Sequence, residues 1–204
     1  MPIKTGTTLD GIGALAVASE RLLRALADKT VDRFLSSWPA AAQQTRTPQP
    51  STLQVLGWLA DACAAGPPET REVLDRLLAL SPRLAWAQTY TAADIGGSFL
   101  DRYGWTELIG RRGPVASDRI AAGFLLLGPD TEYPAHSHDA EEIYLPLSGV
   151  AAWQRGTEAW RERRPNAPIH HPSGMPHAMR TAREPLLALY LWRGGDLTEK
   201  SRLG

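Results

Sequence analysis

The sequence predicts an α+β fold in which a helical N-terminal part, residues 1–85, packs on an all-β C-terminal part, residues 86–204. Two observations lead to this prediction. Apolar residues recur at helical intervals through the first part of the chain, whereas short runs rich in β-branched, leucine and aromatic residues follow from about Trp86. With 204 residues, the chain can bury a substantial core without disulfide bonds.

The N-terminal part is expected to contain several helices. Breaks at 48–51 and 66–68 interrupt the helical pattern, and residues 70–80 resume it just after a proline pair, where helices often begin. The apolar positions that carry the pattern fall into three groups, which are Leu15, Leu22, Leu23 and Leu26, then Leu53, Leu56 and Leu59, then Val73, Leu77 and Leu80.

The C-terminal part is expected to form short strands. Glycine, proline, asparagine and serine separate them, a pattern typical of an antiparallel sandwich or barrel. The predicted strands are 106–110, 119–128, 142–149, 151–156, 158–163, 167–171 and 185–195.

Charge and composition exclude several classes of partner. The 22 basic and 22 acidic residues cancel, so we expect neither nucleic acid nor an anionic membrane as a partner. No apolar run approaches the ~18 residues of a membrane span, and acids and glycines interrupt the N-terminal stretch where a secretory signal would be apolar. The single cysteine, Cys63, is expected in the core and fits a reducing compartment, so we expect a soluble cytoplasmic protein.

All five histidines lie within about a fifth of the chain. His136 and His138 alternate, so on an extended strand both point to one face. Glu142 follows four residues after His138, and His177 ends a segment, 172–177, whose glycine and prolines permit a tight turn. The sequence therefore predicts that these four residues, His136, His138, Glu142 and His177, bind one metal ion.

Neutral imidazoles with one carboxylate suit Zn, Fe(II), Mn, Co or Ni better than Ca or Mg, and they leave coordination positions for a substrate. Which of these five ions is used stays open. His170 and His171 lie on a strand where only one of them can face inward. We expect them to support the site or lie on the surface rather than bind the ion.

The spacing His136-x-His138-x₃-Glu142-x₆-Gly149, followed by Pro172-x-Gly174-x₂-His177, resembles the paired motifs of the cupin superfamily. The resemblance covers about residues 120–192 and implies a jelly-roll barrel, also called a double-stranded β-helix. The sequence departs from the cupin pattern at structural positions only: seven residues separate Gly128 from His136, and Asn166 and Thr181 replace the usual glycine and asparagine. A cupin that has lost its metal is the alternative, but no predicted ligand is missing.

Tyr144 lies two residues beyond Glu142, so an extended strand turns both side chains to the inner face. A divalent cation beside a phenol lowers the pKa of that phenol, which could then lose its own proton at neutral pH. The resulting phenolate could remove a proton from a substrate. If the ion also binds a substrate carboxylate, it stabilises the charge that develops on the neighbouring carbon. These features favour β-elimination with Tyr144 as the base.

Residues 133–144, YPAHSHDAEEIY, together with HPSGMPHAM, LLALYLW and the helical extension, resemble the cupin-type dimethylsulfoniopropionate (DMSP) lyases of the DddQ kind. The resemblance implies cleavage of DMSP to dimethyl sulfide and acrylate, with Tyr144 as base and His138, Glu142 and His177 as ligands. His136 would be a fourth ligand or would face the substrate. Tyr133 and Trp192 match aromatic pocket positions, which suit a soft sulfonium cation. The expected partner is therefore a small carboxylate of the sulfonium zwitterion type.

Three alternatives stay open. The protein could act on a different small carboxylate, it could be an Fe(II) cupin dioxygenase, or it could bind a small effector without catalysis. The sequence does not decide whether it forms a homodimer or how the helices contribute to the site. The remaining tryptophans are expected to pack in the core rather than line the pocket, and they are Trp38, Trp58, Trp86, Trp105, Trp153 and Trp160.

Overall fold

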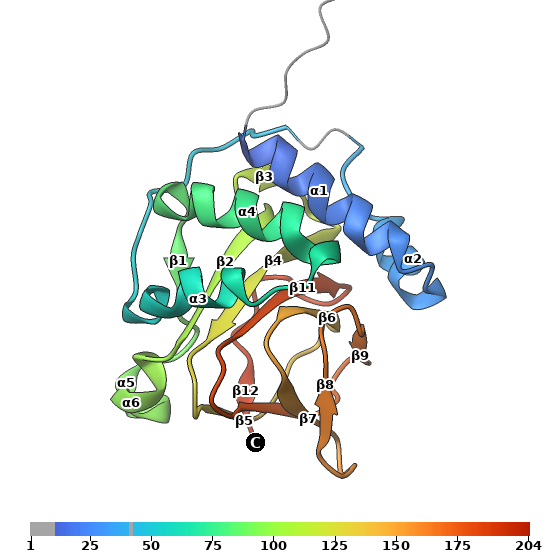
Figure 1. Ribbon diagram of the computed structural model, residues 1–204. Coiled ribbons are helices and arrows are strands. Elements are labelled where there is room, and N and C mark those ends of the chain that lie inside the picture. Colours follow the sequence, from blue (N-terminus) through green and yellow to red (C-terminus); the bar gives the residue numbers. More distant parts are fainter. Residues whose placement is uncertain (1–10, 41–42) are drawn as a thin grey trace, which may run out of the picture.

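The computed structural model describes residues 11–40 and 43–204, and it places a layer of helices against one side of a two-sheet β-barrel (Figure 1). Residues 1–10, which we assigned to the helical extension, and residues 41–42 lie outside the described residues. The helical layer consists of α1 (Gly11–Ala25), α2 (Lys29–Leu35), η1 (Gln54–Trp58), α3 (Leu59–Ala64), η2 (Pro68–Thr70), α4 (Arg71–Leu80) and η3 (Ser81–Arg83).

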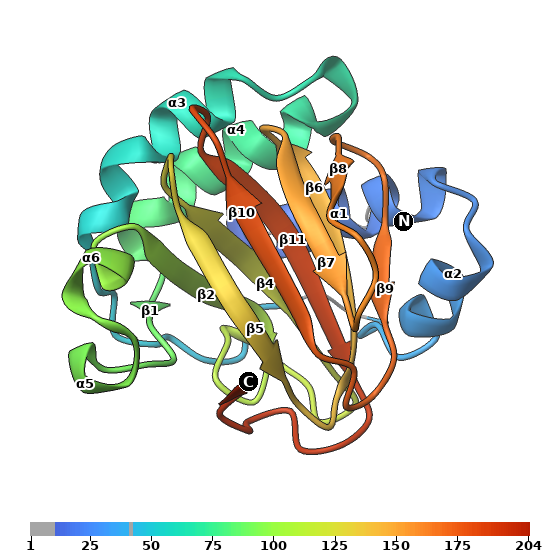
Figure 2. The same cartoon turned by 90° about the horizontal axis from the view of Figure 1, so that it is seen from below.

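The barrel is built from a seven-stranded and a five-stranded sheet, seen face to face in Figure 2. The first sheet has the order β1-β2-β4-β11-β6-β9 with β3 beside β2, and the second has the order β12-β5-β10-β7-β8. Every strand pair is antiparallel except β2 with β3. Two antiparallel sheets packed in this way form the jelly-roll barrel that we predicted.

The bounds of the strands are β1 (Trp86–Ala87), β2 (Tyr103–Gly110), β3 (Val115–Ala116), β4 (Ile120–Leu127), β5 (Glu132–Ser137), β6 (Glu141–Ser148), β7 (Ala151–Arg155), β8 (Arg161–Arg163), β9 (Ile169–His171), β10 (His177–Thr181), β11 (Leu186–Arg193) and β12 (Arg202–Leu203).

The seven-stranded sheet is buried on both faces. In β11, Leu187 and Leu189 join the hydrophobic cluster formed with the helices, whereas Leu186 and Ala188 face the barrel interior. Because side chains alternate across a strand, covering both faces requires an unbroken apolar run, which explains the sequence LLALYLW. The helical layer therefore completes the core of the sheet that carries half of the barrel.

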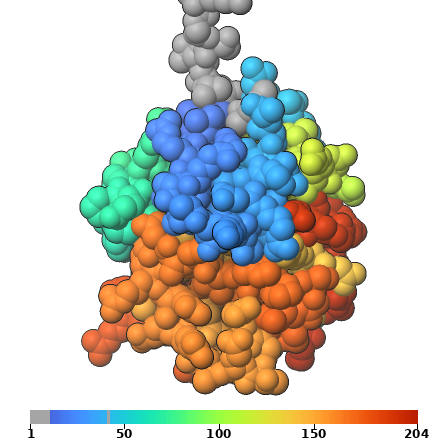
Figure 3. Space-filling model, turned by 90° about the vertical axis from the view of Figure 1, so that its right-hand side faces the viewer, coloured from blue at the N-terminus to red at the C-terminus, as the bar shows by residue number. Residues whose placement is uncertain are grey.

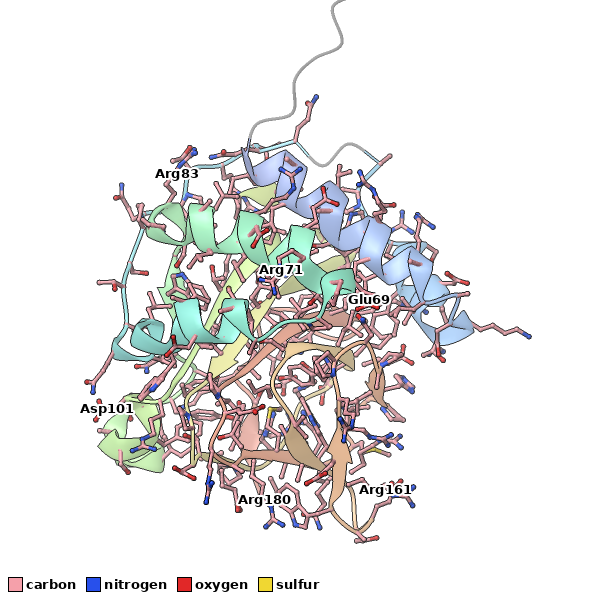
Figure 4. The ribbon with its side chains drawn as sticks, viewed as in Figure 1. Glu69, Arg71, Arg83, Asp101, Arg161 and Arg180 are labelled. Carbon is pink, nitrogen blue, oxygen red and sulfur yellow. The ribbon has the colours of Figure 1, made fainter. Side chains whose placement is uncertain are left out.

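Polar contacts fix the helical layer in place. Thr70 donates a hydrogen bond to the carbonyl of Leu147 on β6 at 2.9 Å. Arg71, labelled in Figure 4, donates to the carbonyls of Cys63 and Gly66 at the end of α3. Arg33 of α2 pairs with Glu141 of β6, and the space-filling view shows the blue N-terminal helices resting directly on the orange strands (Figure 3). The helices thus cover one side of the barrel.

The C-terminal segment, residues 197–204, folds back onto the barrel, and the chain ends beside β5 (Figure 2). Arg112 donates to the carbonyl of Thr198, and Lys200 pairs with Asp94 at 2.9 Å. Asp94 belongs to the short helix α5 (Ala92–Ile95), which is followed by α6 (Gly97–Leu100). Residues 197–201 of this segment line the cavity described below.

The seven predicted strands are confirmed, but the sequence analysis did not identify β1, β3, β10, β12 or the helices α5 and α6. The signal for α5 was local, since Thr91 and Asp94 form a capping box. The division between residues 85 and 86 stays a prediction. Within the described residues, no helix has both the length and the apolar character needed to cross a membrane.

Candidate metal centre and cavity

Three strands bring His138, Glu142 and His177 together inside the barrel. His138 follows β5 directly, Glu142 is the second residue of β6, and His177 begins β10. One ligand atom from each lies within 4.8 Å of the others, and all three residues are buried. The structure therefore joins three of the four predicted ligands in a group that could hold a metal ion.

The histidines of this group are oriented by the backbone. His138 Nδ1 lies 2.9 Å from the carbonyl oxygen of Ala140, and His177 Nδ1 lies 2.9 Å from that of Met175. A carbonyl can only accept, so each Nδ1 carries a proton, and each ring directs its Nε2 to the centre of the group.

Both Nε2 atoms point at the same carboxylate oxygen. His138 Nε2 lies 2.9 Å from Glu142 Oε2, and His177 Nε2 lies 3.1 Å from it without forming a hydrogen bond. Unprotonated ring nitrogens and a carboxylate repel one another unless a proton or a metal ion lies between them. A divalent transition metal ion satisfies all three donors at once, so these residues fit such an ion.

Charge coupling in the group appears in its pKa values. Burial alone would raise the pKa of Glu142, but the neighbouring His138 and His177 hold that pKa well below its usual value. Burial alone would lower the pKa of His138, but the charge of Glu142 and the hydrogen bond to it outweigh burial and raise that pKa above 6.5. Without a metal ion, these two shifts favour the charged forms of Glu142 and His138 beside each other.

His136 lies outside this three-residue group but touches it. Its ring stacks on Tyr133 with centroids 3.9 Å apart and meets the His177 ring at 4.2 Å. Its Nδ1 lies 2.9 Å from the carbonyl of Pro134, and burial holds its pKa well below 6.5, so the ring is neutral. His136 also lines the cavity described next, and its assignment as ligand or substrate contact stays a prediction.

A cavity of about 360 Å³ opens beside the group. Its size suits a small molecule, because ligand sites in proteins commonly measure about 300–1,000 Å³. Five of the seven predicted site residues line it, namely Tyr133, His136, Glu142, Tyr144 and Trp192. Of His138, Glu142 and His177, Glu142 is thus the residue that lines the cavity.

Tyr144 lies on the inner face of β6, as predicted. Its ring is almost fully buried, and its centroid lies 6.3 Å from that of His177. Burial, followed by the charge of Glu142, raises the pKa of Tyr144 well above 10 in the metal-free protein. Tyr144 therefore needs a nearby cation to become a base at neutral pH.

Other cavity residues were missed at the sequence level. Tyr103, Trp105 and Glu107 line the cavity as well. The expectation that Trp105 only packs in the core is wrong, since its indole N–H donates to Thr89 Oγ1 and its ring forms part of the wall. Tyr190, two residues before Trp192 on β11, also lines the cavity, as strand alternation predicts.

The two remaining histidines are not among the three donor residues. His170 is partly exposed and lies 2.8 Å from Glu141. His171 is fully buried, stacks on His177 with centroids 4.1 Å apart, and forms no hydrogen bond within the described part of the chain. Only one of the pair faces inward, as we expected from strand alternation.

Known proteins match this chain along most of its length. A family model described as dimethylsulfoniopropionate lyase matches residues 27–188. The dimethylsulfoniopropionate lyase DddQ of Ruegeria pomeroyi is 40% identical over 122 residues, which cover 60% of this chain and 61% of the relative. A protein of the DddL type from Cereibacter sphaeroides is 31% identical over 150 residues, which cover 72% of this chain and 62% of the relative. The chain thus spans about three fifths of these curated relatives.

Solved structures agree with these sequence matches. A chain from the crystal structures of the DMSP lyases RdDddP and RnDddQII superposes with a TM-score of 0.86 at 29% identity, covering 95% of this chain and 97% of that one. The crystal structure of DMSP lyase DddQ from Ruegeria pomeroyi gives a TM-score of 0.83 at 30% identity, covering 95% and 96%. By sequence and by structure, the chain belongs to the dimethylsulfoniopropionate lyase family.

Proposed function

We propose that this protein is a metal-dependent lyase that cleaves dimethylsulfoniopropionate to dimethyl sulfide and acrylate. One observation carries the proposal: the buried group of His138, Glu142 and His177 meets a small aromatic cavity that also contains Tyr144. The names of the relatives support the same substrate. The ion itself would be one of Zn, Fe(II), Mn, Co or Ni.

The chain supplies the groups that β-elimination requires. A divalent ion in the site would stabilise the negative charge that builds up next to the substrate carboxylate. As a phenolate, which a divalent ion in the site would favour, Tyr144 removes the proton from the carbon beside that carboxylate. The released electron pair forms the carbon–carbon double bond, and the carbon–sulfur pair leaves with sulfur as neutral dimethyl sulfide. Atoms and charge balance, because the proton ends on the Tyr144 oxygen.

The aromatic wall suits the cationic end of this substrate. Tyr133 and Trp192 line the cavity, and Trp192 stacks on His138 with centroids 4.0 Å apart. An aromatic face attracts an onium group by about 0.5–2 kcal/mol. His136, buried and neutral, faces the same cavity and can contact the substrate without repelling its positive charge.

The first test is an activity assay across metals. Protein stripped of metal is loaded in turn with Zn, Fe(II), Mn, Co and Ni and incubated with DMSP, while headspace dimethyl sulfide and dissolved acrylate are measured. We expect both products in equal amounts and only with metal present. Silence with every ion would refute cleavage of DMSP and direct the assay to other β-substituted carboxylates.

A second candidate function is oxidation by an Fe(II) dioxygenase. Two histidines and one carboxylate are the ligand set that non-haem Fe(II) oxygenases use, and His138, His177 and Glu142 supply it. Oxygen uptake by the Fe(II)-loaded protein, recorded with an oxygen electrode, separates this function from the lyase reaction, which consumes no oxygen.

A further inference from the structure

Glu107 lies in the cavity wall across from the proposed base. Strands β2, β4, β11 and β6 are consecutive neighbours, and their pairing aligns Glu107, Gly123, Tyr190 and Tyr144 in one row. Three inter-strand spacings separate the two ends of this row, about 14 Å along the sheet. Glu107 and Tyr144 both line the cavity, so a small ligand can lie between them.

Gly123, in the row between these two residues, has no side chain. A Cβ atom added at Gly123 would lie only 2.8 Å from the Tyr190 hydroxyl and 2.0 Å from the carbonyl of Thr106. Glycine therefore leaves space for the Tyr190 phenol on this face of the sheet. Ala121, the next inward residue on β4, also lines the cavity.

The carboxylate of Glu107 is buried without a cationic partner. Its Oε1 accepts the backbone N–H groups of Arg112 and Gly113, the latter at 2.7 Å. Within the described residues, it forms no ion pair, and no hydrogen bond involves its Oε2. Burial raises the pKa of Glu107 above its usual value, and these N–H groups and the charges of Arg112 and Arg46 partly offset that rise. A buried charge without a partner is costly, which points to a role with a ligand.

Arg112 forms no ion pair with this carboxylate among the described residues. Arg112 also lines the cavity, but its guanidinium donates to the carbonyl of Thr198 and lies 5.9 Å from the centre of the Trp105 ring. Its hydrogen bond therefore anchors the C-terminal segment. Besides Arg112, the cavity wall near Glu107 includes the aromatic rings of Trp105, two residues earlier on β2, and Tyr190, which lies in the same row as Glu107.

We propose that Glu107 is a specificity-determining residue that binds the cationic end of a small zwitterion whose carboxylate lies toward Glu142 and its histidines. A carboxylate next to aromatic faces is the arrangement that favours an onium group over an uncharged group of the same shape. The proposal rests on the proposed lyase function, because it assumes that the ligand enters with its carboxylate at the metal site. It extends that function by naming the residue that selects for positive charge.

The test compares two ligands of the same shape that differ only in charge. In 3-(trimethylammonio)propanoate the onium is cationic, and in 4,4-dimethylpentanoate a carbon atom replaces the nitrogen. Dissociation constants for both are measured by titration calorimetry on the metal-loaded protein and on Glu107→Gln, whose amide oxygen can still accept the two backbone N–H groups. Glu132→Gln, on the exposed outer side of β5, controls for a change in net charge.

We expect Glu107→Gln to weaken binding of the cationic ligand by about 10- to 100-fold, as loss of one charge interaction in a partly desolvated cavity would do. Binding of 4,4-dimethylpentanoate, which has no positive charge, should stay within about twofold of its original value, and Glu132→Gln should change the binding of neither ligand. With DMSP as substrate, Glu107→Gln should raise KM more than it lowers kcat.

Equal weakening of both ligands, or no change in either, would show that Glu107 only supports the loop that follows β2. Failure of either ligand to bind the metal-loaded protein would also overturn the proposal. If Glu107→Gln does not fold, the unaltered protein still decides, because equal affinity for the two ligands would exclude charge selection. Binding is measured without turnover, so a failed lyase assay and a failed charge preference remain distinct results.

Discussion

The indole N–H of Trp192 donates a hydrogen bond of 2.7 Å to Oε1 of Glu142. This bond engages one carboxylate oxygen and leaves Oε2 directed at His138 and His177. Since the Trp192 ring also stacks on His138, one side chain orients two of the three donors. Groups that orient metal ligands in this way commonly affect metal affinity as well as substrate binding.

Trp192→Phe should therefore weaken metal binding by about 10- to 100-fold while keeping the fold, because phenylalanine retains an aromatic ring but cannot donate to Glu142. Affinity is measured by competition with a chromophoric chelator. Trp153→Phe is the matched control, since the Trp153 N–H has no hydrogen-bond partner among the described residues. Equal losses in both variants would assign the effect to packing.

Tyr144→Phe should abolish release of dimethyl sulfide while metal affinity stays within about threefold, because only the proposed base is removed. Product release and chelator competition are measured on the same preparation. A Phe variant with near-normal turnover would remove Tyr144 from the role of base.

His177→Ala should lose both metal and activity, because one of three donors disappears and a buried carboxylate is left without compensation. Metal content after dialysis is read by atomic emission. His170→Ala is the control, since His170 neighbours the site but pairs with Glu141 instead. Full metal occupancy in His177→Ala would contradict the ligand assignment.

Metal affinity should fall as pH decreases. A metal ion requires the unprotonated Nε2 of His138, and the pKa of His138 is raised above 6.5, so protons begin to compete with the ion above that pH. Between about pH 8 and pH 5, the apparent dissociation constant measured by chelator competition should rise steadily. A flat profile would mean that His138 is not a ligand.

The group of His138, Glu142 and His177 could be predicted from the sequence because its residues are close along two short segments, and strand alternation fixes which side chains face inward. His138 and Glu142, four residues apart, span a single turn between β5 and β6. The pairing of β10 with β5, which brings His177 to His136, was implied only by the resemblance to cupins.

The rest of the cavity could not be predicted because it depends on contacts between distant segments. Glu107 and Trp105 reach the cavity through the pairing of β2 with β4, and sequence periodicity gives no information on strand order. The C-terminal residues 197–201 line the cavity because β12 pairs with β5 and because Arg112 and Asp94 bind Thr198 and Lys200. Such long-range pairings are set by the packing of the whole barrel rather than by local patterns.

Leu77→Ala should destabilise the protein by about 2–5 kcal/mol, because Leu77 on α4 is fully buried in the cluster that joins the helices to the seven-stranded sheet. Leu78→Ala is the matched control. Leu78, the next residue on α4, is 40% exposed, so its substitution should cost less than about 1 kcal/mol. Urea unfolding is followed by circular dichroism and by release of bound metal. If helices and barrel share one core, both signals change at one midpoint that Leu77→Ala lowers. Two separate midpoints, with only the first lowered, would instead show that the parts divided at residue 85 unfold independently.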